Sequence, residues 1–367
     1  MRILVAPDKF KDCLSANEVA DAIARGLRGV DPKIEIDLCP MADGGEGFVD
    51  ALVRSTGGRF ITHRVTGPLP EMKVDARFGL LGDGETAVIE MSSASGLHLL
   101  GREDRNPMHT TTFGTGELLK FAVQMDCRKI LLGIGGSATC DGGIGCAQAC
   151  GLPVLLEGGE PTSDTEPLCG RDLEKVLLVK KHRGGRVNGI DITVACDVTN
   201  PLYGRRGAAR VFGPQKGASP AEVALLDAWL ELLAERCAAT EAAHQPGAGA
   251  AGGLGFAMLA FFNAQLRAGI DLVMQATQFQ QRVKNADLVI TGEGNLDASS
   301  AGGKVVSGVA GACLAAGVKC VAICGDTDGS AISGLHQVVN LSREAGSSEE
   351  SMRNARQWIE CVVVQLL

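Results

Sequence analysis

The chain has 367 residues, a formal net charge of −8, 49 glycines and only 4% aromatic residues. This composition disfavours a nucleic-acid groove, which needs a basic face and stacking platforms, and no run of about 18 apolar residues is present to cross a membrane. The residues after Met1 lack the pattern of a signal peptide, and the 13 cysteines form no Cys-x-x-Cys pair, so we expect a cytoplasmic two-domain protein without a disulfide framework or zinc site.

The N-terminal part of the chain alternates between strand and helix patterns. Strand patterns cover residues 3–6 and 34–39, and helical patterns cover residues 17–28 and 47–55. Ser15, followed three residues later by Glu18, is a capping box that begins the first helix. The alternation predicts a parallel βαβ unit.

The pattern changes after residue 60. Three short strands separated by Gly-Pro and Gly-Asp-Gly turns predict an antiparallel meander at residues 61–65, 72–78 and 87–91. Helical patterns follow at 116–125, 144–150, 221–236 and 254–266, with strand patterns at 176–179, 192–196 and 210–212. Residues 129–133 form a further strand, and periodicity alone does not decide which sheet it joins.

The C-terminal part of the chain repeats the opening pattern, with strands at 288–291, 319–324 and 338–341 and helices at 304–317 and 349–364. Similar patterns at both ends suggest one domain that the middle of the chain interrupts. We therefore predict an α/β protein in which residues 1–60 and 286–367 form a doubly wound parallel-sheet domain. Residues 61–285 form an inserted mixed α/β domain.

An apolar strand at residues 129–133 runs directly into a glycine-rich segment that contains Ser137, Thr139 and Asp141. Backbone N–H groups approach an anion closely only where Cβ atoms are absent, and a helix that begins near Asp141 would point its positive end at the anion. A carboxylate beside an anion is tolerated when a cation such as Mg²⁺ lies between them. The segment therefore predicts a metal–phosphate site.

Other phosphate-binding motifs compete with this interpretation. The chain has no P-loop, and the Gly-x-Gly-x-x-Gly match at residues 247–252 has no strand before it. Residues 133–138 follow a strand, and Glu157 lies about 20 residues further on, as in a dinucleotide-binding loop. The polar segment after residue 138 is atypical of that loop, but an NAD-dependent oxidoreductase stays an alternative.

Acidic residues recur beside glycines just after predicted strands, at Asp43 and Glu46, at Asp141, and at Glu293 and Asp297. In open α/β sheets ligands bind outside the carboxyl ends of strands, so these segments are expected to converge on one crevice.

Three further polar segments fit the same pattern. Asp8-Lys-Phe-Lys11 follows the first strand, Asp197 follows the strand at 192–196, and Lys216 lies between turn-forming residues. A carboxylate at a strand end suits proton abstraction or metal binding, and the lysines suit an anionic substrate.

The chain resembles the bacterial type I glycerate kinase family over nearly its whole length. The resemblance rests on motifs that include Ala6-Pro-Asp-Lys-Phe-Lys11, Asp43-Gly-Gly-Glu-Gly47, Gly133-Ile-Gly-Gly-Ser-Ala-Thr139, Val211-Phe-Gly-Pro-Gln-Lys-Gly-Ala218 and Ala286-Asp-Leu-Val-Ile-Thr-Gly-Glu-Gly294. It implies a two-domain α/β enzyme with a flavodoxin-like half that uses ATP and Mg²⁺ to phosphorylate D-glycerate to 2-phosphoglycerate.

The resemblance, together with the chemistry of phosphoryl transfer, assigns hypothetical roles to the site residues. Asp197 orients or deprotonates the glycerate hydroxyl, and cations offset the negative charge. The three sets are Lys9, Lys11 and Lys216 as the catalytic cations; Gly135, Gly136, Ser137, Thr139, Glu293 and Asp297 as the ATP-binding residues; and Asp43, Glu46 and Asp141 as the Mg²⁺ ligands. We expect ATP and glycerate to bind in a hinged cleft between the domains.

Three positions depart from the family pattern. Cys140 stands where the family usually has Asn, Asn295 where it usually has Arg, and Ser299-Ser300 where Gln-Thr or Gln-Ser is common. Loss of an Arg removes a two-pronged anion ligand. These departures concern the wiring of the phosphate or glycerate site and the choice of substrate. Separately, a non-catalytic sensor of sugar acids, which kept the fold but lost turnover, is a further alternative.

Overall fold

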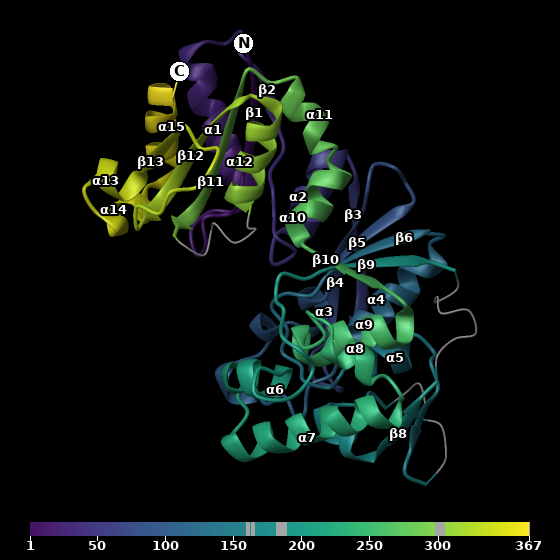
Figure 1. The fold of residues 1–367 in the computed structure, drawn as a ribbon. Coiled ribbons are helices and arrows are strands. Elements are labelled where there is room, and N and C mark those ends of the chain that lie inside the picture. The colour runs from purple at the N-terminus through teal and green to yellow at the C-terminus, as the bar shows by residue number, and fades with distance from the viewer. Residues whose placement is uncertain (159–161, 163–165, 181–188, 298–304, 367) are drawn as a thin grey trace. The chain divides into compact units, whose positions relative to one another are not determined.

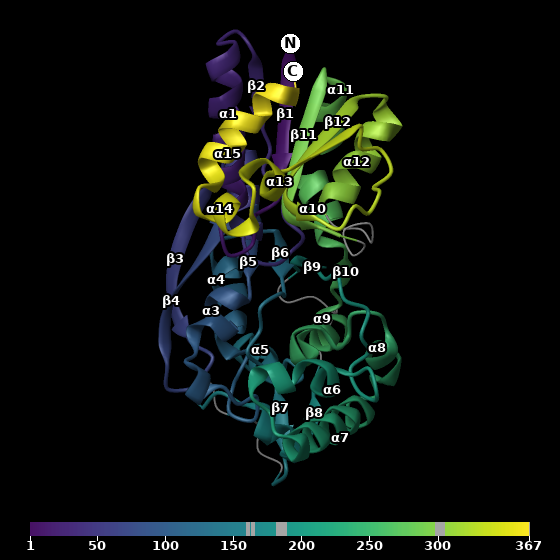
Figure 2. The same ribbon diagram turned by 90° about the vertical axis from the view of Figure 1, so that its left-hand side faces the viewer.

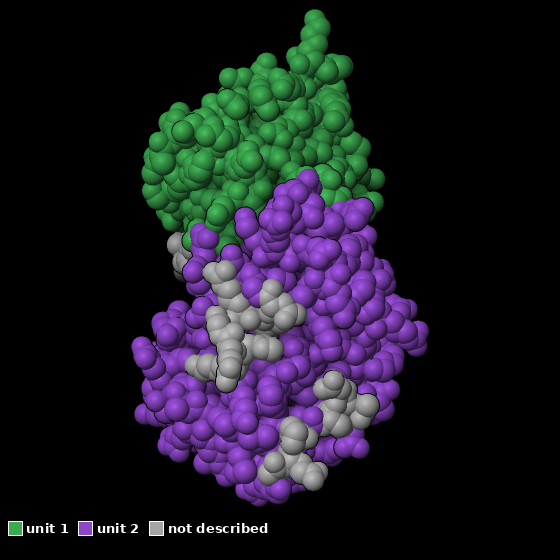
Figure 3. Space-filling model, turned by 90° about the vertical axis from the view of Figure 1, so that its right-hand side faces the viewer, with its two compact units in different colours: residues 1–43, 47–58, 270–367 green, residues 44–46, 59–269 purple. Residues whose placement is uncertain are grey.

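The computed structural model describes residues 1–158, 162, 166–180, 189–297 and 305–366. The chain forms two compact units, shown in Figure 3: unit 1 comprises Met1–Asp43, Gly47–Gly58 and Ile270–Leu367, and unit 2 comprises Gly44–Glu46 and Arg59–Gly269. The chain returns to unit 1 earlier than the expected residue 286, because helices α10 (Gly269–Ala276) and α11 (Phe279–Lys284) pack with unit 1. Arg282 of α11 donates hydrogen bonds to Asp37 Oδ1 (3.1 Å) and to the Ser55 carbonyl (2.7 Å) of that unit.

Unit 1 is built on a five-stranded sheet in the order β13-β12-β11-β1-β2, and every neighbouring pair is parallel. The strands are β1 (Arg2–Pro7), β2 (Glu35–Leu38), β11 (Leu288–Leu296), β12 (Lys319–Thr327) and β13 (Gln337–Asn340). Counted along this unit, the order is 2-1-3-4-5, which is the flavodoxin-like arrangement. The predicted doubly wound parallel sheet is confirmed, and its strand order reverses between β1 and β11.

Helices cover both faces of this sheet. Figure 2 shows α1 (Ala16–Val30) and α15 (Ala355–Val362) on one side and α11 and α12 (Val305–Ala316) on the other. The core under α1 and α15 is formed by alternate strand residues such as Ile3, Val5 and Ile290. The predicted capping box begins α1: Ser15 Oγ accepts the Glu18 N–H, and Glu18 accepts the Ser15 N–H (2.9 Å).

The remaining helices of unit 1 are α2 (Phe48–Thr56), α13 (Leu341–Ala345), α14 (Ser348–Arg353) and the 3₁₀ turn at Val363–Leu366. The predicted final helix at 349–364 is therefore divided into shorter segments. Residue 304, the expected start of the helix at 304–317, lies outside the described residues. Strands β11 and β12 run past the predicted ends at 291 and 324, because glycines let the two backbones stay in close contact: a Cβ on Gly325 would lie 2.4 Å from the Gly294 carbonyl.

Unit 2 contains a six-stranded mixed sheet in the order β10-β9-β6-β5-β4-β3 (Figure 1). The strands are β3 (Arg59–Thr66), β4 (Lys73–Leu80), β5 (Thr86–Glu90), β6 (Lys129–Gly133), β9 (Asp191–Ala195) and β10 (Gln265–Arg267). Strands β3, β4 and β5 are antiparallel, as predicted, and β6 pairs in parallel with β5 and β9. The strand at residues 129–133 thus belongs to the inserted unit.

The other elements of unit 2 are α3 (Ser92–Ser95), α4 (Phe113–Gln124), α5 (Ile144–Ala149), α6 (Ala208–Phe212), α7 (Pro220–Arg236), α8 (Thr240–His244) and α9 (Leu254–Phe262), the strand pair β7 (Val154–Leu156) and β8 (Val176–Val179), and 3₁₀ turns at Leu97–Leu99, Arg102–Asp104, Gly170–Lys175, Pro214–Lys216 and Ala250–Gly253. Two predictions here were wrong. Residues 210–212 belong to helix α6, and the helix expected at 254–266 ends at Asn263, whose positive φ of 52° stops it before β10.

Candidate active site

In unit 1, the carboxyl groups of Asp8 and Glu293 lie where the strand order reverses, and that of Asp43 is close enough to act on Asp8. Asp8 follows β1, and its N–H donates to the Gly292 carbonyl of β11 (2.8 Å), which places it beside the strand that carries Glu293. Burial, the Asp43 carboxylate and, more weakly, Glu293 raise the pKa of Asp8 to about 7. Ligands of doubly wound sheets bind at this point of the topology, so the three carboxyl groups are the candidate cation-binding part of the site.

Asp8 was not chosen as a site residue from the sequence, although the motif that contains it was noted. Its position directly after a buried strand was the available signal. This position points to a binding site only once the strand order is known. Strands β1 and β11 come from opposite ends of the chain, and their parallel pairing is what brings Asp8 next to Glu293.

The other predicted residues of unit 1 lie around this strand end. Lys9 donates its N–H to Asp8 Oδ1 (2.7 Å), and Lys11 is exposed further along the same loop. Asp297 accepts a hydrogen bond from the side-chain amide of Asn295 (2.8 Å). Ser299 and Ser300 lie outside the described residues. The segment expected as an acidic glycine turn at 292–297 is instead mostly the end of β11.

In unit 2, the glycine-rich segment after β6 forms an exposed turn over a buried ammonium group. Gly135 and Gly136 are exposed, whereas Lys216 is only 3% exposed. The Lys216 ammonium donates to Ser137 Oγ and to the Thr139 carbonyl, both at 2.7 Å. The structure thus brings Lys216 next to the segment that contains Gly135, Gly136, Ser137 and Thr139.

Burial lowers the pKa of Lys216 to about 8. The neighbouring Cys140 is fully buried, and burial raises the pKa of its thiol to about 12, so it is neutral and gives Lys216 no counter-ion at pH 7. The ammonium therefore lies beneath the turn with hydrogen bonds to two uncharged oxygens. The Asp141 carboxylate acts to raise the pKa of Lys216 but does not outweigh burial, so the charge of the ammonium is only partly compensated. Such a cation beside exposed backbone N–H groups favours binding of an anion.

Asp141 does not face this turn. It is completely buried, its Oδ2 accepts from the N–H (2.8 Å) and hydroxyl (2.7 Å) of Thr112, and its Oδ1 accepts from the Gly143 N–H (3.0 Å). The expected helix at Asp141 begins instead at Ile144. Asp141 therefore holds α4 and α5 together, and the metal-ligand hypothesis for this residue is withdrawn.

The glycine pair after Asp141 is structural as well. Gly142 and Gly143 have positive φ angles, and the Gly142 N–H donates to the Gly252 carbonyl (3.0 Å). A Cβ on Gly252 would lie 2.0 Å from the Thr139 carbonyl. The Gly-x-Gly-x-x-Gly match at residues 247–252 is therefore a buried support for the Thr139–Cys140 backbone.

The acidic motif at residues 43–46 divides between the units. Asp43 belongs to unit 1, whereas Gly44–Glu46 packs with unit 2, where a Cβ on Gly44 would lie 2.6 Å from that of Ala195. Gly135 comes close to the Gly45 backbone, and Glu46 is exposed. The glycines are therefore needed for the close approach of this segment to the ends of β6 and β9.

Asp197 is exposed just beyond the end of β9, and its Oδ1 accepts the Gly269 N–H (3.1 Å). The ends of neighbouring strands β6 and β9 thus carry the glycine turn and a carboxylate at the same edge of the sheet. This arrangement suits a phosphate and a hydroxyl that are to react with each other.

Three observations limit the alternatives. No helix opens at the glycine turn, since residues 137–143 are not helical, and a dinucleotide-binding loop requires one there. Among the described residues, no group of three His, Cys, Asp or Glu side chains is arranged to hold a metal ion by itself. Within the same part of the chain, no helix is long and apolar enough to cross a membrane.

Comparison with known proteins identifies the family of the chain. The model of the glycerate kinase family matches residues 3–367. Glycerate kinase from Bacillus subtilis is 43% identical over 98% of this chain and 95% of its own length, and glycerate 2-kinase from Escherichia coli is 42% identical over 97% and 94%. A crystal structure of a candidate glycerate kinase 2 from Salmonella typhimurium LT2 superimposes with a TM-score of 0.86 at 40% identity, covering 100% of this chain and 98% of that one.

The structure therefore agrees with the sequence relationships on the fold as well as on the motifs. The chain belongs to the glycerate kinase family and is a phosphotransferase with an alcohol group as acceptor.

Proposed function

We propose that this protein uses ATP to phosphorylate D-glycerate and yields 2-phosphoglycerate. The observation that carries the proposal is the buried Lys216 ammonium beneath the exposed glycine turn. The names of the relatives, above all glycerate 2-kinase from Escherichia coli, support the choice of substrate and position.

The glycine turn and Lys216 bind a phosphate group in this proposal. Within the described residues, no hydrogen bond uses the N–H groups of Gly135, Gly136 or Ser137, so these donors can point at an anion. Lys216 supplies the positive charge that offsets charge developing on the transferred group.

Asp197 acts on the acceptor in the proposed reaction. It is the predicted carboxylate at the end of β9, next to the strand that leads into the turn. A carboxylate there orients the glycerate hydroxyl and accepts its proton as the bond to phosphorus forms. Lys9 and Lys11 are proposed to offset the remaining charge of the phosphates or of the glycerate carboxylate.

The carboxyl groups of unit 1 fit a magnesium ion, although they do not form a complete ligand set. The raised pKa of Asp8 reflects burial together with repulsion from Asp43 and Glu293, and a divalent cation would relieve this repulsion. Mg²⁺ in nucleotide enzymes uses one or two carboxylates together with phosphate oxygens and water.

Asp8, Asp43 and Glu293 are the proposed holders of the ion, with Glu46 and Asp297 as further candidates. When bound, Mg²⁺ neutralises phosphate charge and aligns the phosphate chain.

A panel assay tests the proposal. ADP release is measured with ATP, Mg²⁺ and each of several small hydroxy acids, and D-glycerate is expected to give the highest kcat/KM. The same preparation should be stabilised against heat by ATP with Mg²⁺ and not by NADH. A protein that binds glycerate without releasing ADP would be a sensor, and one that binds NADH would be an oxidoreductase; either result would refute the proposal.

A further inference from the structure

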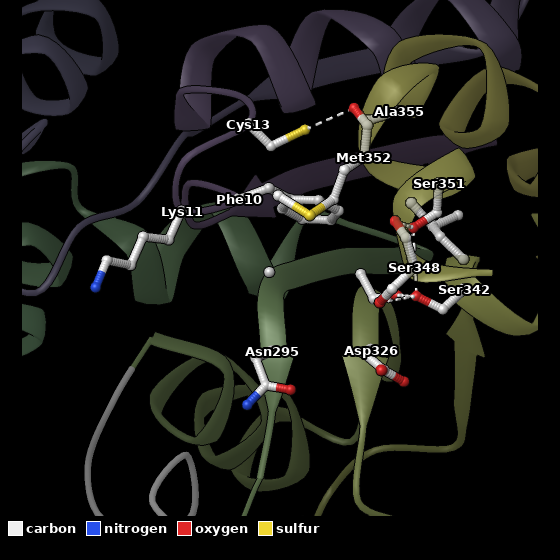
Figure 4. Close-up of a pocket in the computed structure, with 13 residues that line it drawn as sticks. Phe10, Lys11, Cys13, Asn295, Asp326, Ser342, Ser348, Ser351, Met352 and Ala355 are labelled. Carbon is white, nitrogen blue, oxygen red and sulfur yellow. Dashed lines mark hydrogen bonds between the residues drawn. The ribbon is translucent and has the colours of Figure 1, made fainter.

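Unit 1 contains a pocket of about 300 Å³, and Lys11 is the one predicted site residue among the described residues that line it. It lies over the carboxyl ends of β11 and β12 and is bordered by the loop after β1 and by α14 (Figure 4). If Gly294 carried a Cβ, that atom would lie 3.0 Å from the backbone nitrogen of Lys11. A Cβ on Gly325 would lie 2.4 Å from the carbonyl oxygen of Gly294. Both glycines line the pocket, and each is needed for the close packing of neighbouring backbone segments because a Cβ would overlap backbone atoms.

The walls differ in chemistry. Figure 4 shows Phe10 and Met352 together at one side of the pocket. Met352 is half exposed, whereas Phe10, Leu341 and Ala355 are buried and contribute only small apolar edges to the wall. Asp326 lies opposite Asn295 in the register of β12 and β11. Ser342, Ser348 and Ser351 form a chain of hydroxyl groups, in which Ser342 donates to the Gly325 carbonyl (2.7 Å) and lies 2.9 Å from the Ser348 oxygen.

Asp326 presents a hydrogen-bond acceptor to the pocket. Its Oδ1 accepts the Thr327 N–H (2.8 Å) and the side-chain amide of Asn340 (3.0 Å). These bonds fix the orientation of the carboxylate and leave Oδ2 with no hydrogen bond among the described residues. A carboxylate also binds a ribose hydroxyl in the dinucleotide-binding Rossmann arrangement, which is another doubly wound sheet.

We propose that this pocket binds the nucleoside half of the nucleotide donor. The base lies against Phe10 and Met352, the ribose hydroxyls donate to Asp326, and the phosphates extend past Lys11 towards the strand ends that carry Asp8 and Glu293. The inference rests on the proposed function, because it assigns the place of the ATP that the reaction consumes.

Charge and size favour a nucleoside over glycerate in this pocket. Asp326 would repel the carboxylate of a hydroxy acid, whereas the hydroxyls of a neutral ribose donate to it. The volume lies at the lower end of the range of small-molecule pockets, which suits a single base and sugar.

The first test compares two nucleotides and two matched variants. KM is measured for ATP and for 2′,3′-dideoxyATP with the unaltered enzyme, with Asp326→Asn, and with Asp328→Asn. Asp328 is an exposed carboxylate two residues further on that does not line the pocket. The unaltered enzyme and Asp328→Asn should bind dideoxyATP about 10-fold or more weakly than ATP, because a hydrogen bond to a charged group is lost.

Asp326→Asn should raise the KM for ATP by a similar factor and abolish the preference for ATP, while the KM for D-glycerate stays unchanged. An unchanged KM for ATP, or equal increases for both nucleotides, would overturn the inference. Failure of the proposed function would look different: the unaltered enzyme would then release no ADP with any hydroxy acid.

A second test needs no mutation. Cys13 lines the pocket, and Cys361 is an exposed thiol that does not. ADP with Mg²⁺ should slow alkylation of Cys13, followed by peptide mass spectrometry, and should leave Cys361 unaffected. D-glycerate alone should protect neither thiol. Protection of Cys13 by glycerate but not by ADP would assign the pocket to the acid and overturn the inference.

Discussion

Replacing Lys216 by Met separates a catalytic role from a structural one. The substitution keeps an unbranched side chain that is one atom shorter and removes its charge. Lys216 is the only buried lysine among the described residues, and it is fixed by two hydrogen bonds of 2.7 Å directly beneath the glycine turn. If it stabilises charge on the transferred phosphate, kcat/KM should fall by about 10²–10³-fold.

The same substitution should not destabilise the protein. The difference between the ordinary pKa of 10.5 and about 8 corresponds to a burial cost of about 3 kcal/mol, since one pKa unit is worth about 1.4 kcal/mol. Removing the ammonium relieves this cost but leaves the buried Thr139 carbonyl without its donor, which costs about 1–3 kcal/mol. We therefore expect a change in the free energy of unfolding between zero and about 2 kcal/mol of stabilisation.

The lowered pKa of Lys216 also predicts how the free energy of unfolding changes with pH. Between pH about 8 and 10.5 the unfolded chain holds a proton on Lys216 that the folded chain has lost, so stability rises with pH in this window. Lys216→Met should abolish that rise.

Urea unfolding at pH 7 and pH 9.5 measures the change in the free energy of unfolding, and steady-state kinetics measures the change in kcat/KM. The matched control is Lys120→Met, which removes the charge of an exposed lysine. Activity within tenfold of the unaltered enzyme would refute the catalytic role. A clear loss of stability relative to Lys120→Met would refute the energetic reasoning.

Three further predictions concern the surrounding residues. Asp197→Asn should lower kcat by about 10²–10⁴ with little change in ATP affinity, and near-normal turnover in steady-state kinetics would remove Asp197 as the base. The pKa of Asp8 is raised from 3.8 to about 7 in the folded chain. Between pH 4 and 7 the folded chain therefore holds a proton on Asp8 that the unfolded chain has lost, so the free energy of unfolding should fall as pH rises. Asp8→Asn should flatten this fall in urea titrations and raise the Mg²⁺ concentration needed for half-maximal activity. Gly252→Ala should destabilise the protein by at least about 1–3 kcal/mol in thermal unfolding, because φ is +67° and the new Cβ would overlap the Thr139 carbonyl; an unchanged melting temperature would show that this backbone contact is dispensable.

The sequence predicted the sheets better than the details of the site. Alternation of strand and helix patterns at both ends of the chain was sufficient to predict one interrupted parallel-sheet unit, because βαβ units have few allowed connections. Local patterns failed where tertiary packing decides. The short apolar run at residues 210–212 fits a strand or a helix equally well, and the structure makes it part of α6.

Site prediction failed for a similar reason. A carboxylate before two glycines is the same pattern whether it faces a ligand or the core, and only the contact with Thr112, far back in the chain, shows that Asp141 is buried. Asp8 was missed because its neighbours Asp43 and Glu293 come together only through the strand order. Lys216 was proposed as a site residue because its motif resembles that of a known family; the local pattern alone would not have suggested it, since a lysine between turn-forming residues is usually solvated.

The product of the reaction tests the central claim most directly. Purified enzyme is incubated with ATP, Mg²⁺ and D-glycerate, and the phosphorylated acid is identified by phosphorus NMR against authentic 2-phosphoglycerate and 3-phosphoglycerate. We predict a resonance of 2-phosphoglycerate that grows in step with ADP. Formation of 3-phosphoglycerate would contradict the proposed position, and the absence of any phosphorylated acid would contradict the proposed reaction.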